Sequence, residues 1–317
     1  MNVLAIIQGA LGDGVMALWG LQAVVEHTGC SLTLFCAPGL GGLAKNLGLA
    51  QAAFPVQSPE IASLYGPAPS PWVREQIQAR DSVLVFSFSR DLFSAVQSLS
   101  RQAYSIPPRP KPGERVHVLD RILSHLQKAG LVDPEAGTGY SHMLHAFDLY
   151  ARAGRPANAP VLLHPGSGSP RKNWPLESFG KLFDALEEKG IPGKMVLGPD
   201  DHGLEQGLEA WERKPEILRP ESLLEFKDLL TASRAYAGND SGATHVAAML
   251  GVPAAALFGP SDPVRWRPVG PRVQVFRGEC ESVPCFETRE KNCREGKCLD
   301  SIAPGEILEF LELARYK

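Results

Sequence analysis

A polar run, Gly-Asn-Asp-Ser-Gly-Ala-Thr-His, occupies positions 238–245, after a short apolar segment, 234–237, and before a stretch of small residues. The pattern predicts a strand that ends in the run and a helix that begins directly after it. Parallel sheets bind ligands at the carboxyl ends of their strands, and a helix N-terminus favours an anion such as a phosphate. Asp240 would then suit a sugar or ribose hydroxyl. The alternative is that Asp240 or Ser241 caps the helix and that His245 is a core histidine.

A second loop of similar character covers residues 164–175, His-Pro-Gly-Ser-Gly-Ser-Pro-Arg-Lys-Asn-Trp-Pro. It leaves a predicted strand and leads into a predicted helix. Its small residues, Gly168 among them, let backbone N–H groups come close to a phosphate. Ser167 and Ser169 add hydroxyl donors, and Lys172 adds a positive charge. The loop therefore predicts a diphosphate site, against the alternative of a flexible, solvated loop.

A third loop, Gly9–Gly14, follows the first predicted strand and contains Gly12 and Asp13. It lacks the Gly-x-Gly-x-x-Gly spacing of a dinucleotide site, as does the rest of the chain, so a nicotinamide oxidoreductase is disfavoured. Asp13 is either a helix cap or a general base held among apolar side chains. All three loops fall at predicted carboxyl ends of strands, which favours a shared binding site over capping alone.

The composition indicates an ordinary globular protein of 317 residues, 44% of them hydrophobic, which is enough for two domains with buried cores. The formal net charge of −3 gives no basic field, so nucleic acid is not an expected partner. No apolar stretch is long enough to cross a membrane. The first residues, Met-Asn-Val-Leu-Ala-Ile-Ile, are typical of a strand rather than a secretion signal, so a cytoplasmic location is expected.

Apolar runs and helical patterns alternate in both halves of the chain. This alternation predicts two doubly wound α/β domains, 1–155 and 156–317. The boundary falls in a segment, 150–160, that has two prolines and no apolar period and is interpreted as a linker. An amphipathic helix at about 304–314 ends the second domain and could pack back on the first. The predicted strands are 3–7, 31–36, 82–88, 161–164, 194–197, 234–237 and 254–258.

These motifs, in this order, resemble those of the bacterial heptosyltransferase family, the ninth family of glycosyltransferases. Together they span nearly the whole chain, although each alone is short. In the first half the matching pieces are Leu-Gly-Asp at 11–13 and Val-His-Val-Leu-Asp-Arg at 116–121. In the second half they are His-Pro-Gly-Ser at 164–167, Lys-Asn-Trp-Pro at 172–175, Asn-Asp-Ser-Gly at 239–242 with His245, Gly-Val-Pro at 251–253 and Phe-Gly-Pro-Ser at 258–261.

The resemblance implies a GT-B fold, in which two Rossmann-like domains face each other across a cleft. It implies an inverting, metal-independent transfer of heptose from ADP-heptose to a lipopolysaccharide-core-like acceptor, with no cofactor required for catalysis. By position, Asp13 resembles the catalytic base, Gly12 lies on the acceptor side, and Asp201 resembles a ribose contact. The other donor-side positions are Ser167, Gly168, Lys172, Ser241 and Gly242, which resemble a diphosphate cradle, and Asp240 and His245, which resemble sugar-nucleotide contacts. Because the sequence has no Asp-x-Asp metal motif, a lysine and helix dipoles would have to stabilise the leaving diphosphate.

The implied partners are an ADP-sugar donor and a lipid-linked or oligosaccharide acceptor. Two other interpretations stay open: a transferase of the same fold with another donor or a protein acceptor, and a nucleotide-sugar-binding protein without turnover. A lipid-linked acceptor would bring peripheral contact with the inner membrane. The candidate contacts, which a solvated basic loop explains equally well, are Arg101, Arg109, Lys111 and Arg115.

Four cysteines, Cys280, Cys285, Cys293 and Cys298, fall within nineteen residues in the spacing Cys-x4-Cys-x7-Cys-x4-Cys. The intervals are wider than those of most zinc knuckles. Three interpretations compete: a structural metal site, buried thiols that brace a loop, and disulfides in an oxidised sample. The other two cysteines, at positions 30 and 36, flank a predicted strand and are interpreted as small buried hydrophobic residues.

Overall fold

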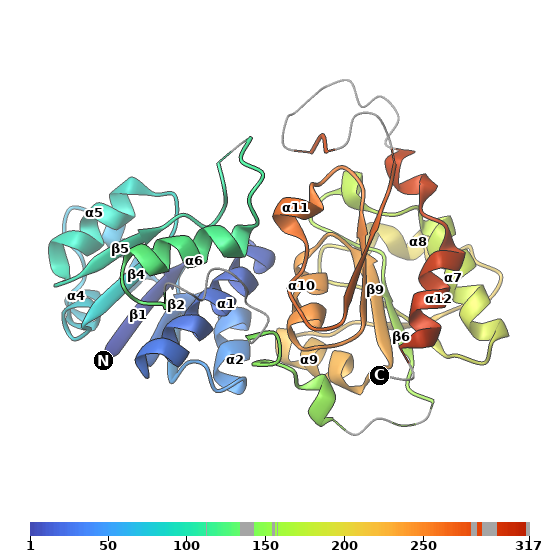
Figure 1. Ribbon diagram of the computed structural model, residues 1–317, viewed down its shortest axis with the longest axis horizontal. Coiled ribbons are helices and arrows are strands. Elements are labelled where there is room, and N and C mark those ends of the chain that lie inside the picture. The colour runs from blue at the N-terminus through green and yellow to red at the C-terminus, as the bar shows by residue number, and fades with distance from the viewer. Residues whose placement is uncertain are drawn as a thin grey trace. The chain divides into compact units, whose positions relative to one another are not determined.

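The computed structural model describes residues 1–111, 113–133, 143–153, 156, 158–279, 284–286 and 297–314. The chain divides into two compact units, Met1–Ala146 and Phe147–Lys317 (Figure 1). Each unit is built around one parallel β-sheet with helices on both faces. This confirms the prediction of two doubly wound α/β domains.

The first unit has a five-stranded sheet in the order β3-β2-β1-β4-β5. This is a Rossmann order, in which the chain reverses its direction of winding between β1 and β4. The strands are β1 (Asn2–Ile7), β2 (Ser31–Cys36), β3 (Ala52–Pro55), β4 (Ser82–Phe86) and β5 (Ala103–Ile106). The helices are α1 (Leu11–Thr28), α2 (Pro38–Asn46), α3 (Pro59–Ala62), α4 (Pro71–Gln78), α5 (Arg90–Leu99) and α6 (Val118–Lys128), with the 3-10 turn η1 (Ser63–Tyr65).

The second unit has a six-stranded sheet in the order β11-β10-β9-β6-β7-β8, and its winding reverses between β6 and β9. The strands are β6 (Val161–His164), β7 (Gly193–Val196), β8 (Glu216–Leu218), β9 (Ala235–Asn239), β10 (Ala254–Phe258) and β11 (Val273–Arg277). The helices are α7 (Leu176–Glu188), α8 (Glu205–Glu209), α9 (Leu223–Ala232), α10 (Gly242–Met249), α11 (Pro263–Trp266) and α12 (Pro304–Leu313). Its 3-10 turns are η4 (Tyr150–Arg152), η5 (Pro170–Lys172), η6 (His202–Leu204) and η7 (Lys297–Ser301).

The central strands of both sheets are almost entirely buried. Every residue of β6, β9 and β10 is buried, and so is all of β1 except its first residue. A central parallel strand is covered by helices on both faces, so both of its faces must be apolar. These rigid strands fix the positions at which the polar loops emerge.

Part of the expected linker is anchored in the second unit. Tyr150 is buried, and its hydroxyl donates a hydrogen bond to the Arg234 carbonyl at 2.6 Å. Nearby, Arg272 donates a charged hydrogen bond to Asp148 at 2.9 Å. The second unit consequently begins at Phe147, before the boundary that the sequence suggested at residue 155.

The last helix, α12, contributes to the core of the second unit. Ile307 and Leu311 are fully buried in the cluster that also contains Phe179 and Leu182 of α7. Packing of this helix on the N-terminal domain stays a prediction. Among the described residues, no helix is long and apolar enough to span a lipid bilayer.

Candidate functional site

The second unit brings two of the predicted loops together at its switch point. β6 and β9 are neighbours, with His164 paired to Gly238, so the loops that follow them leave the same edge of the sheet. The Asn239 side chain joins them, because it accepts a hydrogen bond from the Trp174 backbone at 2.9 Å and donates one to the Pro165 carbonyl at 2.8 Å. Asn239 is fully buried, so these bonds are protected from water.

An ion pair links the same two loops. Lys172 Nζ lies 2.9 Å from Asp240 Oδ2, with the lysine side chain 21% exposed and the aspartate 6% exposed. The ammonium group also lies 4.6 Å from the centre of the Phe286 ring. The lysine is therefore held at the sheet edge by a carboxylate and an aromatic face while it keeps some access to solvent.

The start of α10 offers backbone donors at the same edge. Ser241 occupies the N-cap position, but its side chain makes no capping hydrogen bond. The sequence alternative of a Ser241 cap is therefore not what the structure shows. Ser241, Gly242 and Ala243 are partly exposed, and the first amides of a helix have no partner within it. We call Lys172 and these three residues the phosphate cradle, after the role that the sequence predicts for this edge of the sheet.

A buried hydrogen-bond chain lies behind the cradle. His164 Nε2 lies 3.1 Å from Asp201 Oδ2, and His164 Nδ1 lies 3.1 Å from the Tyr236 hydroxyl. A carboxylate only accepts, so Nε2 carries a proton and, in the neutral ring, Nδ1 accepts from the tyrosine. Burial raises the pKa of Tyr236 well above its usual range, which keeps the hydroxyl protonated as this donor.

The predicted ribose contact, Asp201, is engaged in this chain. It is 7% exposed, and its Oδ2 also accepts a hydrogen bond from the Gly198 backbone at 2.7 Å. A side chain at Gly166 would overlap its carboxyl group. In this arrangement the Asp201 carboxylate braces the loop after β6, and its contact with a ribose remains a prediction.

The other donor-side residues differ in their surroundings. The Ser167 hydroxyl is used within its own loop, 2.6 Å from Asn173 Oδ1 and 2.8 Å from the Ser169 carbonyl. Gly168 is exposed, and a side chain there would meet no atom within 4 Å. His245 is buried in α10. Of these, Gly168 has the most open backbone.

In the first unit, Asp13 forms a bidentate pair that the sequence did not indicate. Arg109 Nε donates to Asp13 Oδ1 at 3.1 Å, and Arg109 Nη2 donates to Oδ2 at 2.7 Å. Oδ2 also accepts from the Ala10 backbone at 3.1 Å, so Asp13 does help to cap α1. Both carboxylate oxygens therefore lie against hydrogen-bond donors, which the expectation of apolar walls did not include. Gly12 lies in the same first turn, partly buried.

The backbone before Asp13 requires a glycine. Gly9 has a φ of 142°, a conformation that L side chains rarely adopt. A Cβ atom there would also lie 2.7 Å from Asp13 Oδ2. Both facts show that the turn is shaped around the carboxylate.

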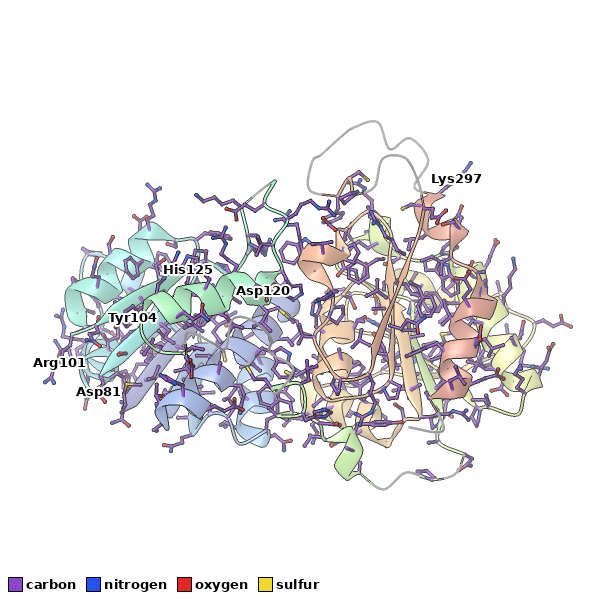
Figure 2. All side chains as sticks on the ribbon, viewed as in Figure 1. Asp81, Arg101, Tyr104, Asp120, His125 and Lys297 are labelled. Carbon is purple, nitrogen blue, oxygen red and sulfur yellow. The ribbon has the colours of Figure 1, made fainter. Side chains whose placement is uncertain are left out.

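The basic residues named as candidate membrane contacts lie at different edges of the first sheet. Arg101 precedes β5, and the pairing of Val83 with Ala103 places it at the amino-terminal edge of the sheet, near Asp81 (Figure 2). Lys111 follows β5 and leaves the opposite edge, as Arg109 does. The four basic residues therefore do not form one patch.

Two of the four clustered cysteines are described, and both are buried. Cys285 Sγ lies 3.7 Å from Arg171 Nη2, and Cys298 belongs to the core of the second unit. Cys280 and Cys293 lie outside the described residues. Within the described part of the chain, no group of three or more metal-ligating side chains is assembled. Cys30 and Cys36 are buried, as expected.

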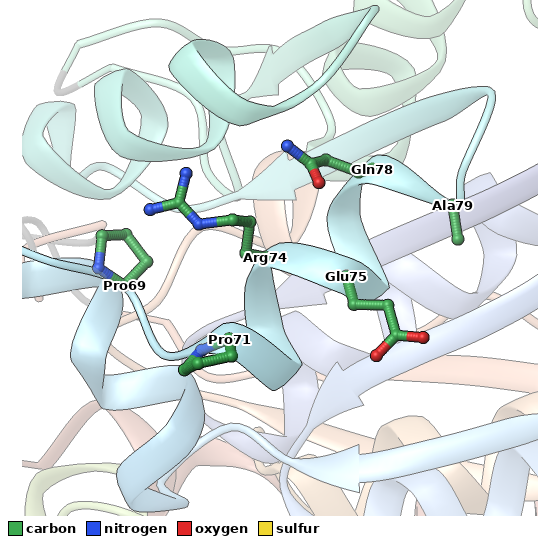
Figure 3. Close-up of a pocket in the computed structure, with 6 residues that line it drawn as sticks. All are labelled: Pro69, Pro71, Arg74, Glu75, Gln78 and Ala79. Atoms are coloured by element: carbon green, nitrogen blue, oxygen red, sulfur yellow. The ribbon is translucent and has the colours of Figure 1, made fainter.

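One surface depression lies on the exposed side of α4, between Pro69 and Ala79 (Figure 3). Arg74, Glu75 and Gln78 project around it. It includes none of the residues at the strand ends, so we assign it no part in the candidate site.

Comparison with known proteins places these motifs in a family. The protein-family model described as "Glycosyltransferase family 9 (heptosyltransferase)" matches residues 109–298. Lipopolysaccharide heptosyltransferase 3 of Escherichia coli is 28% identical over 213 residues, which are 63% of this chain and 60% of that protein. The chain spans 60%, 41% and 42% of the length of three curated relatives that it matches.

Two solved structures from Escherichia coli show the same fold. One is the structure of ADP-heptose lps heptosyltransferase II, with a TM-score of 0.74 and 19% sequence identity. The match covers 99% of this chain and 98% of that chain. The other is described as the bacterial iron-containing dodecameric glycosyltransferase TibC, with a TM-score of 0.61 and 15% sequence identity. The match covers 98% of this chain and 75% of that chain. The two Rossmann-like units are thus those of the GT-B fold, and the chain belongs to glycosyltransferase family 9, the heptosyltransferase family.

Proposed function

We propose that the protein transfers a heptosyl group from ADP-heptose to an acceptor of the lipopolysaccharide core type, with inversion at the anomeric carbon. Family membership and the names of the matched relatives support the reaction class and the donor. The observation that carries the proposal is the phosphate cradle. Lys172 and the uncapped start of α10 meet at the switch point of the second sheet, where an α/β fold binds nucleotides.

The cradle would hold the diphosphate of the donor. When the bond to the sugar breaks, negative charge develops on the leaving ADP, and preorganised cations and N–H dipoles stabilise it. Lys172 would supply the cation, and the backbone of Ser241–Ala243 would supply the dipoles. Asp240, which holds the lysine through Oδ2, would accept a hydrogen bond from a sugar hydroxyl. With these donors, the transfer that we propose is metal-independent.

Asp13 would act as the general base. It would take the proton of the acceptor hydroxyl while that oxygen attacks the anomeric carbon and the bonding pair departs with ADP. Its place after the first strand of the N-terminal Rossmann-like unit, with Gly12 beside it, agrees with a role on the acceptor side.

Acceptor, location and metal content stay predictions. We propose a lipid-linked or oligosaccharide acceptor and a cytoplasmic enzyme in peripheral contact with the inner membrane. A structural metal at the cysteine cluster also stays open, because one structural neighbour is described as iron-containing. Metal analysis of freshly purified, reduced protein decides this point. A metal content below about a tenth of an equivalent ends the metal interpretation.

Thermal unfolding with a panel of nucleotides tests the donor class. A ligand that binds only the native state stabilises it, by about 2.7 kcal/mol at a concentration of 100 Kd. We expect ADP and ADP-heptose to raise Tm, and UDP and GDP to leave it unchanged. A rise with UDP or GDP but not with ADP would favour the alternative of another donor.

A further inference from the structure

The contact between Asp13 and Arg109 fixes the carboxylate in one orientation. The guanidinium reaches both oxygens from a residue 96 positions away in the sequence, at 3.1 Å and 2.7 Å. The Asp13 side chain is 8% exposed, whereas that of Arg109 is 47% exposed. The carboxylate is therefore held from one side by a rigid planar donor that solvent and ligands can reach.

The two oxygens of Asp13 are not equivalent. Oδ2 accepts two hydrogen bonds, from the Ala10 backbone and from Arg109 Nη2. Among the residues that the structure describes, Oδ1 accepts one, from Arg109 Nε. Each carboxylate oxygen has two lone pairs, so Oδ2 is saturated and Oδ1 keeps one acceptor position.

We propose that Arg109 is a positioning residue of the transfer reaction, whose bidentate bond directs Asp13 so that Oδ1 takes the proton of the acceptor hydroxyl. This inference rests on the proposed function. In the step, the acceptor O–H bond breaks and its proton moves to Oδ1. The acceptor oxygen bonds to the anomeric carbon, and the electron pair of the broken carbon–oxygen bond leaves with ADP.

The size of the expected rate loss follows from the position of the base. A base that is displaced by about 1 Å loses on the order of 10²-fold in rate. Without Arg109, the Asp13 carboxylate keeps only the Ala10 backbone bond, to one oxygen, and can rotate about its side-chain torsions. Lysine would keep the charge but donate from a single point, so it replaces the guanidinium only in part.

Steady-state kinetics of Arg109→Ala and Arg109→Lys, with Arg74→Ala as the control, test the inference. Arg74 is an exposed arginine of α4 in the same unit, so its variant removes an equal charge. We expect kcat to fall about 10²-fold in Arg109→Ala and less in Arg109→Lys, with the donor KM unchanged and Arg74→Ala close to wild type. Millimolar guanidinium should restore part of kcat in Arg109→Ala and none in Asp13→Asn.

The competing roles of Arg109 give different results. If Arg109 binds the acceptor and does not direct Asp13, the acceptor KM rises at constant kcat, and the inference is overturned. A kcat in Arg109→Ala within twofold of wild type also overturns it. If the side chain only supports the fold, kcat and Tm fall together and guanidinium gives no rescue.

Thermal unfolding of Asp13→Asn, Arg109→Ala and the double variant separates this inference from the proposed function. If the pair forms, the Tm shift of the double variant is smaller than the sum of the single shifts. Additive shifts show that the pair is absent and overturn the inference. If the shifts are non-additive but the wild-type protein transfers no sugar, the contact between Asp13 and Arg109 is confirmed. The proposed function is then wrong, and so is the role of Arg109 in it.

Discussion

Gly166→Ala places one methyl group where the buried Asp201 carboxylate lies. A Cβ at Gly166 would overlap the Asp201 carboxyl group, so that group must move. Asp201 ends a flexible side chain, but its Oδ2 contacts His164 at 3.1 Å and the Gly198 backbone at 2.7 Å. The substitution therefore breaks the hydrogen-bond chain behind the phosphate cradle.

The cost can be estimated from the two bonds that are lost. A hydrogen bond to a charged group contributes about 1.5 kcal/mol or more, so the two together contribute about 3 kcal/mol. For a domain of 150–250 residues this corresponds to a fall in Tm of about 6–12 °C. Because Asp201 is 7% exposed, solvent screening reduces this value little.

Thermal unfolding of Gly166→Ala and three comparison variants measures this effect. Gly168→Ala is the matched control from the same loop, since a side chain there meets nothing within 4 Å and Tm should not change. The double variant Gly166→Ala/Asp201→Ala removes the overlap and should be no less stable than Asp201→Ala alone. A Tm for Gly166→Ala within 2 °C of wild type, the smallest shift expected from about 1 kcal/mol, would refute the reasoning.

Three further predictions concern the phosphate cradle, the base and a buried thiol. Lys172→Met should weaken ADP binding about tenfold in calorimetry, because one charged hydrogen bond to phosphate is lost. Lys181→Met changes an exposed lysine of α7 and should leave the affinity for ADP unchanged. Asp13→Asn should lower transfer by at least about 10²-fold while the rise in Tm with ADP persists; a full transfer rate would exclude Asp13 as the base. Burial raises the pKa of the Cys36 thiol from 9.0 to about 12, so native protein should resist iodoacetamide at Cys36 at pH 8, and unfolded protein should react. The raised pKa means that this thiol stabilises the fold below pH 9 and that the stabilisation is lost as pH rises toward 12, which urea titrations across that range would show.

The sequence predicted the central strands and missed the edge strands. β6 and β10 match their predicted bounds because strands buried on both faces are continuous apolar runs. Two of the four edge strands, β3 and β8, carry only Ala-Ala-Phe-Pro and Glu-Ile-Leu. Edge strands are short and partly solvated, so their sequences show little pattern. Neither strand could be recognised before the sheet was known.

The candidate site was predicted by residue type but not by partner. Lys172 and Asp240 were each assigned to the donor from local motifs, and the structure shows that they contact each other. The pairing of Asp13 with Arg109 joins residues 96 positions apart, and no local pattern encodes it. Asn239 appeared only as one letter of a motif, although its buried amide ties the two donor-side loops together. Partners of this kind are set by the sheet order, which brings distant loops to one edge.

The central claim is that this chain transfers heptose from ADP-heptose and uses Asp13 as the base. The most direct test incubates wild-type protein and Asp13→Asn with ADP-heptose and a heptose-deficient lipopolysaccharide core, and detects the product by mass spectrometry. We predict that wild-type protein adds one heptosyl unit and releases ADP, while Asp13→Asn binds ADP but forms product at least about 10²-fold more slowly. Equal product from both proteins would contradict the assignment of the base. Absence of product from wild-type protein that binds ADP-heptose would contradict the proposed reaction with this acceptor.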